Sequence, residues 1–210
     1  MKKLPARSAV VIVAHPDDEV LWAGGFMLIH PDWDWHVVCT CRKSDPDRAP
    51  RFWRVMDALH CSGSIGDLDD GPEQHLLPAG EVEAEILHLL PSRSFDLILT
   101  HHPNGEYTRH IRHEEVSQAV IALWQSKVIT APELWVFAYT DHQKTHLPRA
   151  MRFANVNHVL PQEIWEKKYG LITRTYGFGT ESFEALTTPK EEAFWILNEP
   201  GMVRPWPFTS

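Results

Sequence analysis

The chain has 210 residues, of which 43% are hydrophobic, and this is enough material for one globular domain over residues 1–210. With 20 Lys and Arg against 28 Asp and Glu, the formal net charge is -8, which excludes a basic footprint for nucleic acid or for an anionic membrane surface. The three cysteines are expected to be reduced thiols of a cytoplasmic protein, and no apolar run is long enough to span a membrane.

Apolar runs rich in Val, Ile and Leu alternate with helical patterns along the chain. Their apolarity is continuous rather than alternating, which is typical of strands buried on both faces. Strands are expected over residues 9–14, 35–41, 95–102 and 134–140. Helices are expected near residues 19–29, 51–60, 81–90 and 114–127. This order predicts an α/β fold with a mainly parallel sheet that helices cover on both sides.

The later part of the chain is less regular. Residues 140–157 are rich in polar side chains and histidine, so a long loop is expected there. A helix is expected over 160–172, with Pro161 near its start. The prolines and aromatics of residues 199–210 predict an irregular tail packed on the domain.

The first apolar run ends in the sequence AHPDDE, which places one histidine and three acids at the end of a core strand. Burying such charge without a partner costs several kcal/mol or more, and a divalent cation would offset that cost. His15 offers a nitrogen and Asp18 an oxygen, a mixture that zinc accepts, although other divalent ions remain open. Asp17 and Asp18 are neighbours and point in different directions, so one can bind a metal while the other faces a water molecule. The alternative is that Asp17 or Asp18 only caps the following helix.

A second cluster of polar residues follows the strand at 95–102, in the sequence THHPNGEYTRHIRHEEV. His110 and His113 are three residues apart, so they project from one face if the segment is helical. His101 and His102 are alternatives that also face this edge, and surface histidines at a helix start are the plain interpretation of the segment. The carboxyl ends of parallel strands meet at one edge, which favours a single site built from both clusters.

The sequence VVIVAHPDDEVLWAGG, taken with the downstream His110 and His113, resembles the zinc-dependent de-N-acetylases of the PIG-L and LmbE-like family. Members of this family remove acetyl groups from N-acetylglucosamine-type sugars. The resemblance implies a Rossmann-like three-layer fold, of the LmbE-like type, over most of the chain and a Zn²⁺ cofactor. It implies that His15, Asp18 and His113 are metal ligands, that Asp17 is the general base, and that His110 is an electrostatic partner of the transition state.

Further residues are expected around this site. Tyr107 is expected as a second donor to the oxyanion. Arg51, which lies in an arginine-rich stretch, and Asp70, in the sequence LDDG, are expected to contact substrate. The family often has an aspartate between its two histidines, whereas this chain has Ile111 and Arg112 there.

The sequence thus predicts a zinc-dependent hydrolase that releases acetate from an N-acetylglucosamine-type amino sugar or its glycoside. Two alternatives are a metal-dependent amidohydrolase acting on a non-sugar amide, and a non-catalytic protein that binds zinc or sugar. The expected partner is a small amino sugar rather than nucleic acid, and both a monomer and a homo-oligomer are open. No glycine fingerprint of the GxGxxG type follows the first strand, which argues against a dinucleotide-dependent oxidoreductase.

Overall fold

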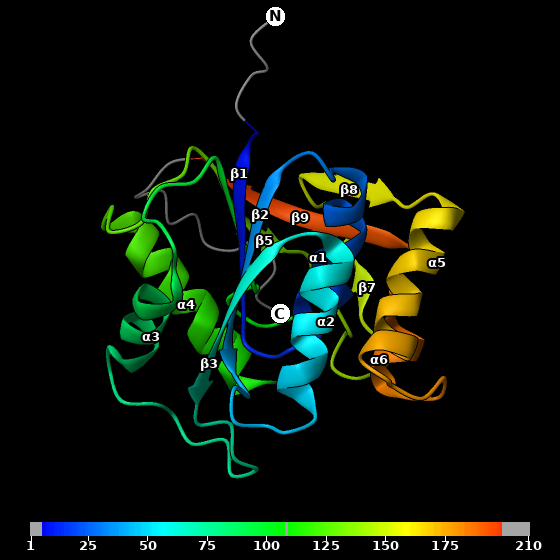
Figure 1. Cartoon of the computed structure of the whole chain (residues 1–210), viewed down its shortest axis with the longest axis horizontal. Coiled ribbons are helices and arrows are strands. Elements are labelled where there is room, and N and C mark those ends of the chain that lie inside the picture. The colour runs from blue at the N-terminus through cyan, green and yellow to red at the C-terminus, as the bar shows by residue number, and fades with distance from the viewer. Residues whose placement is uncertain (1–5, 108, 199–210) are drawn as a thin grey trace, which may run out of the picture.

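The structure is a computed structural model that describes residues 6–107 and 109–198. A seven-stranded sheet runs through its middle in the order β3-β2-β1-β4-β5-β9-β8, with helices on both faces (Figure 1). The pairs from β3 through to β5 are parallel, whereas β9 runs antiparallel to both β5 and β8. The predicted α/β fold with a mainly parallel sheet is therefore confirmed.

The elements have the following bounds. The strands of the large sheet are β1 (Ser8–Val13), β2 (Asp34–Cys41), β3 (Ser62–Leu68), β4 (Leu97–Thr100), β5 (Leu134–Phe137), β8 (Val156–Val159) and β9 (Glu191–Leu197). A separate small pair consists of β6 (Tyr139–Thr140) and β7 (Arg149–Ala150). The helices are α1 (Asp18–Ile29), α2 (Arg48–Leu59), α3 (Glu81–Leu89), α4 (Ile111–Gln125), α5 (Gln162–Gly170), the π-helix η1 (Leu171–Thr175) and α6 (Phe183–Thr187).

Strand β1 shows why this sequence forms a three-layer fold. Its side chains alternate between two separate hydrophobic clusters, because successive residues of a strand point to opposite faces. Val11 and Val13 pack in the cluster that α1 and α2 cover, whereas Val10 and Ile12 pack in the cluster that α3 and α4 cover. A strand buried on both faces needs continuous apolar sequence, and β1 supplies it.

The strand order reverses at the centre of the sheet, between β1 and β4. Strands β1 and β4 are direct neighbours, with Ile12 opposite Thr100. The chain leaves β1 into α1 on one face of the sheet and leaves β4 into α4 on the other face. The two connections diverge at the carboxyl ends of these strands, and ligands bind in such crevices in open α/β sheets.

Several expected boundaries differ from the structure. Helix α2 begins at Arg48, three residues before the expected start, because Asp45 Oδ1 accepts hydrogen bonds from the main-chain N–H groups of Asp47 and Arg48, both at 2.9 Å. Pro50 lies in the first turn, where its missing N–H has no helical acceptor to lose. Helix α4 begins at Ile111 rather than Glu114. Strands β3, β8 and β9 lie outside the apolar runs from which strands were expected.

The expected loop at 140–157 is only partly a loop, because Thr140 ends β6, β7 lies within the region and β8 begins at Val156. The expected helix at 160–172 is present as α5, for which Pro161 is the N-cap residue, followed by η1. The expected tail at 199–210 lies outside the described residues. Among the residues that are described, no helix has the length and apolarity needed to cross a membrane.

A buried ion pair connects α1 to the last strand. Glu192 on β9 accepts hydrogen bonds from the main-chain N–H groups of Gly25 (2.7 Å) and Phe26 (2.6 Å), and Lys168 Nζ on α5 lies 2.6 Å from the same carboxylate. Both charged side chains are 0% exposed. Gly25 makes this approach feasible, since a Cβ there would lie 2.4 Å from the Leu160 side chain and 3.0 Å from the Glu192 carboxylate.

The substitution Glu192→Ala is expected to lower the free energy of unfolding by about 3–5 kcal/mol, because it leaves the Lys168 ammonium buried without its partner. Urea denaturation of the full chain measures this change. Glu191→Ala, on the same strand, serves as the control and is expected to change stability by no more than about 0.5 kcal/mol. Similar losses in both variants would contradict the role of the buried pair.

Candidate metal centre

Asp18 occupies the first position of α1 and is held through both carboxylate oxygens. Its Oδ2 accepts a hydrogen bond from the main-chain N–H of His15 (2.9 Å), and its Oδ1 accepts one from Trp22 Nε1 (3.1 Å). The N-cap residue of the helix is Asp17, whose side chain makes no capping hydrogen bond. Asp17 thus occupies the N-cap position, but its side chain does not cap the helix, and the interpretation of this carboxylate as a cap is wrong.

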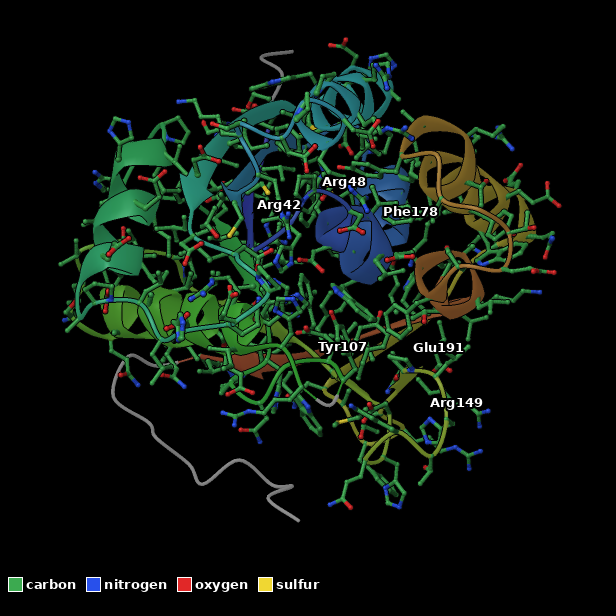
Figure 2. All side chains as sticks on the ribbon, turned by 90° about the horizontal axis from the view of Figure 1, so that it is seen from below. Arg42, Arg48, Tyr107, Arg149, Phe178 and Glu191 are labelled. Carbon is green, nitrogen blue, oxygen red and sulfur yellow. The ribbon has the colours of Figure 1, made fainter. Side chains whose placement is uncertain are left out.

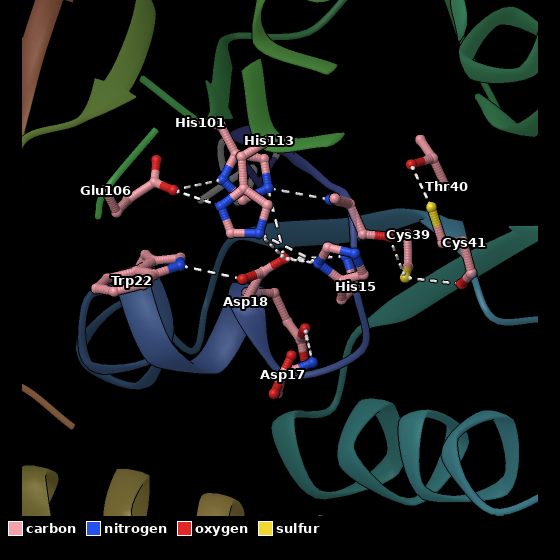
Figure 3. Close-up of polar contacts among 12 residues, drawn as sticks. His15, Asp17, Asp18, Trp22, Cys39, Thr40, Cys41, His101, Glu106 and His113 are labelled. Carbon is pink, nitrogen blue, oxygen red and sulfur yellow. Dashed lines mark hydrogen bonds and ion pairs between the residues drawn. The ribbon is translucent and has the colours of Figure 1, made fainter. Parts of the chain in front are cut away.

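The structure brings His15, Asp18 and His113 together at the carboxyl ends of β1 and β4 (Figure 3). His15 Nδ1 lies 3.2 Å from Asp18 Oδ2 and 3.2 Å from His113 Nε2, and His113 Nε2 lies 3.4 Å from Asp18 Oδ2. Ligand atoms at about 2.1 Å from a tetrahedral ion are about 3.4 Å apart. The three atoms therefore have a spacing that fits a zinc-sized cation.

Two further histidines belong to the same cluster. Atoms of ligand type within 4.8 Å of one another occur in two groups that share His113, one with His15 and His110 and one with Asp18 and His101. His101 Nε2 lies 3.5 Å from Asp18 Oδ2, and His101 Nδ1 lies 3.0 Å from Glu106 Oε2. The main-chain N–H of Ala14 points at His101 Nε2 at 3.0 Å, so the lone pair of this atom already accepts a hydrogen bond.

Glu106 lies behind two of the histidines and was not among the residues expected at the site. Its Oε2 is 2.8 Å from His113 Nδ1 and 3.0 Å from His101 Nδ1, and its Oε1 accepts a hydrogen bond from the main-chain N–H of His102 at 2.9 Å. Burial alone would raise the pKa of Glu106, but its contacts with His101 and His113 lower it to about 2. The only sequence signal was its position between the two histidine pairs.

His110 is the N-cap residue of α4, so its ring meets His113 across the first turn. The centroid of its ring lies 4.7 Å from that of His113 and 4.5 Å from that of His15. Burial, followed by the charges of His113 and His15, lowers the pKa of His110 to about 3. Its Nδ1 has no hydrogen-bond partner among the described residues. In the free site, His110 is therefore a neutral imidazole.

Asp17 has a strained backbone, with φ 130° in a region that residues other than glycine rarely occupy. Its N–H donates to Glu19 Oε2 (3.1 Å) and its carbonyl accepts from Leu21 N–H (2.8 Å). Burial and the neighbouring Asp18 raise the pKa of Asp17 well above its usual value, and Arg48 Nη1 lies 3.9 Å from its carboxylate. Strain of this kind is often found at functional residues.

His15, Asp17, Asp18 and His110 line a cavity of about 390 Å³, which is within the size range of small-molecule sites. Figure 2 shows Arg42, Arg48 and Tyr107 on this side of the molecule, around the start of α1. His113 and His101 do not line the cavity and lie behind it. The lining residues are His15, Pro16, Asp17, Asp18, Leu21, Arg42, Asp45, Arg48, Asp70, Tyr107, His110, Phe183 and Glu184.

The predicted substrate-contacting residues have different positions. Tyr107 lines the cavity, and burial raises the pKa of its hydroxyl, which therefore remains protonated. Asp70 also lines it, with Oδ2 3.3 Å from His15 Nε2 and in contact with Arg42. Arg51 does not line the cavity, because its guanidinium binds Asp47 and the main-chain carbonyl of Tyr176. Arg48, one turn earlier on the same helix, faces the cavity instead.

Fold and site together define a doubly wound α/β protein with a histidine and aspartate cluster of metal-binding type at the switch point of its sheet. A family model described as PIG-L, GlcNAc-PI de-N-acetylase, matches residues 10–124, which is more than half of the chain. The chain belongs to the PIG-L family, and the resemblance expected from the AHPDDE motif is confirmed. An uncharacterized protein of Acanthamoeba polyphaga mimivirus is 25% identical over 181 residues, covering 78% of this chain and 76% of that protein.

Solved structures share the fold at low sequence identity. Dbv21, a deacetylase of an antimicrobial pseudoaglycone, gives a TM-score of 0.60 at 14% identity and covers 92% of this chain and 98% of its own. A deacetylase of teicoplanin biosynthesis gives 0.60 at 12% identity, with 92% and 99% covered. The conserved protein TT1542 from Thermus thermophilus gives 0.58 at 15% identity, with 97% and 100% covered.

The backbone strain at Asp17 predicts an inverted order of stability for two small replacements. Asp17→Gly relieves strain of about 1–3 kcal/mol and costs about 0.5–1 kcal/mol of backbone entropy, whereas Asp17→Ala retains the strain. We therefore expect the glycine variant to be the more stable of the two by about 1 kcal/mol. Chemical denaturation of the metal-free protein measures this difference, and a more stable alanine variant would show that the position is unstrained.

Proposed function

We propose that this protein is a zinc-dependent hydrolase that removes the N-acetyl group from an N-acetylglucosamine-type amino sugar or its glycoside and releases acetate. The observation that carries this proposal is the triangle of His15 Nδ1, Asp18 Oδ2 and His113 Nε2, with sides of 3.2–3.4 Å. Two imidazoles and one carboxylate are a ligand set of catalytic zinc sites, which retain an open coordination position. Membership of a de-N-acetylase family supports the same reaction.

Asp17 is the proposed general base of this reaction. Its carboxylate lines the cavity beside the proposed ligands and has its pKa raised by burial and by Asp18, and a raised pKa suits a base that works near neutral pH. A divalent cation, when bound, supplies a Lewis acid and lowers the pKa of a water molecule towards about 7. Asp17 would accept a proton from a water molecule in the cavity and orient its oxygen towards the acetyl carbon.

His110 and Tyr107 are the proposed donors to the oxygen that becomes negatively charged. The resemblance implies that His110 is an electrostatic partner of the transition state, and its pKa of about 3 makes this imidazole neutral. A neutral imidazole still carries one N–H and can polarise a carbonyl group, as some isomerases show. The protonated Tyr107 hydroxyl is a second donor. Losing one donor of this kind costs about 10²–10³ in turnover.

The leaving amine needs a proton, for which Asp17 and His110 are the two candidates. Because His110 is neutral, we assign this step to Asp17, which carries the proton taken from the water, and acetate is the second product. Asp70 and Arg48 line the cavity beyond the proposed metal ligands. A carboxylate and a guanidinium both form hydrogen bonds with hydroxyl groups, so we assign the sugar contacts to these two side chains.

The direct test is zinc content and acetate release on one sample of the full chain. We expect near-stoichiometric zinc after metal loading, and acetate release from N-acetylglucosaminides that a chelator abolishes and added Zn²⁺ restores. N-acetylated amino acids serve as the comparison substrates. Release from these alone would show an amidohydrolase of non-sugar substrates, and bound zinc without any release would favour the non-catalytic alternative.

The neighbouring aspartates are expected to give opposite phenotypes. Asp17→Asn should retain zinc and lower turnover by about 10²–10⁴-fold, as expected for loss of a general base. Asp18→Ala and His113→Ala should lower the zinc content itself, because each removes a proposed ligand. Asp57→Asn, at an exposed position of α2, is the control for purification and loading. Near-normal turnover in Asp17→Asn would refute the assignment of the base.

A further inference from the structure

We propose that Glu106 is the positioning residue of the metal centre, and that His101 is its second partner rather than a metal ligand. The inference rests on the proposed function, because it concerns how the chain presents His113 to a metal ion. Glu106 is 1% exposed and lies seven residues before His113, in the connection between β4 and α4. Its carboxylate faces the imidazoles of His101 and His113 (Figure 3) and the main-chain N–H of His102.

The acceptor character of Glu106 fixes the tautomer of His113. An ionised carboxylate accepts hydrogen bonds and donates none, so the hydrogen of the 2.8 Å contact belongs to His113 Nδ1. The lone pair of the neutral ring is then on Nε2, the atom 3.2 Å from His15 Nδ1 and 3.4 Å from Asp18 Oδ2. A carboxylate behind a metal-binding histidine acts in this way in many metal sites.

The same reasoning assigns a different role to His101. Its Nδ1 donates to Glu106 at 3.0 Å, which leaves a lone pair on Nε2, but the Ala14 N–H already points at that atom at 3.0 Å. Although Asp18 Oδ2 lies 3.5 Å from the same atom, the main chain directly after β1 therefore uses the acceptor that a metal would need. The ring of His101 stacks on His113, with centroids 4.0 Å apart and planes at 21°, and so supports the orientation of the ligand.

The sequence between His110 and His113 contains no carboxylate, and Glu106 supplies the one that contacts His113. Ile111 and Arg112 stand between His110 and His113, and their side chains cannot accept a hydrogen bond from an imidazole. Arg112 instead pairs with Glu115. The carboxylate partner of His113 thus comes from the preceding connection. At that point the chain turns at Gly105, whose φ of 70° favours glycine.

The test uses Glu106→Gln, which preserves shape but offers one acceptor oxygen and an NH₂ group to three N–H donors. In either orientation of the amide, its NH₂ group faces at least one of the three N–H groups that donate to Glu106, and that N–H group loses its acceptor. We expect the Kd for Zn²⁺, measured on the metal-free full chain by competition with a chromophoric chelator, to rise about 10- to 100-fold. The absorption spectrum of the Co²⁺-loaded variant should change as well, since the orientation of one ligand changes.

Two further variants separate positioning from general stability. Glu114→Gln is the matched control, because this neighbour of His113 pairs with Arg109 and should leave the Kd unchanged. His101→Gln can still accept from Ala14 N–H, so its Kd should rise by much less than tenfold, the smallest effect expected for loss of a carboxylate partner. The melting temperature of each metal-free variant reports stability separately.

Two results would overturn this inference. One is an unchanged Kd for Zn²⁺ in Glu106→Gln, with or without a lower melting temperature, and the other is a loss of zinc in His101→Gln as severe as in His113→Ala. If the wild type still releases acetate in a chelator-sensitive reaction, either result refutes the inference about Glu106 and His101 and leaves the proposed function intact. Zinc binding that depends on Glu106 without any acetate release would refute the function and retain the inference.

Discussion

The buried carboxylate of Asp18 is the group around which the rest of this site is arranged. A charge that is only 4% exposed costs several kcal/mol unless it is compensated, and each neighbouring element supplies part of the compensation. The turn after β1 supplies the N–H and imidazole of His15, α1 supplies the Trp22 indole, and α4 supplies His113. The parallel pairing of β1 with β4 makes this possible, because it brings segments almost 100 residues apart to the same edge. Fold and site therefore depend on the same register.

The residues that sequence analysis placed correctly at this edge are those that follow directly from a strand end or a helical spacing. The AHPDDE segment continues a buried strand, and His110 and His113 begin a helix after the next central strand, so parallel topology alone predicts their proximity. Glu106 follows no such rule. It lies in an irregular connection whose path depends on the turn at Gly105, and a periodicity of 2 or 3.6 residues carries no information about such a path.

Side-chain direction and charge state were also beyond the sequence. Arg51 and Arg48 are equally plausible from composition, but they lie on one helix three residues apart, and only the packed structure shows that Arg51 turns to Asp47 and Tyr176. The neutral state of His110 results from burial beside two other imidazoles, which no local pattern encodes. Strand β9 was missed because Glu191 and Glu192 open it, and acids at a strand start conceal its apolar part. One of these acids is nevertheless fully buried, because Lys168 lies opposite.

The position of Glu192 has a consequence for how the site forms during synthesis. All proposed metal ligands lie within residues 10–124, the part that matches the family model, whereas the carboxylate that holds the middle of α1 comes from β9 and the cation that neutralises it from α5. Domains fold as units while the chain emerges from the ribosome. A nascent chain that has been synthesised as far as the end of α4 thus contains every proposed ligand, but it lacks the carboxylate that braces the helix bearing Asp18. The hydrogen bonds from Gly25 and Phe26 to Glu192 can form only after β9 has been synthesised, so the bracing of the helix that bears Asp18 depends on a segment that follows every proposed ligand in the chain.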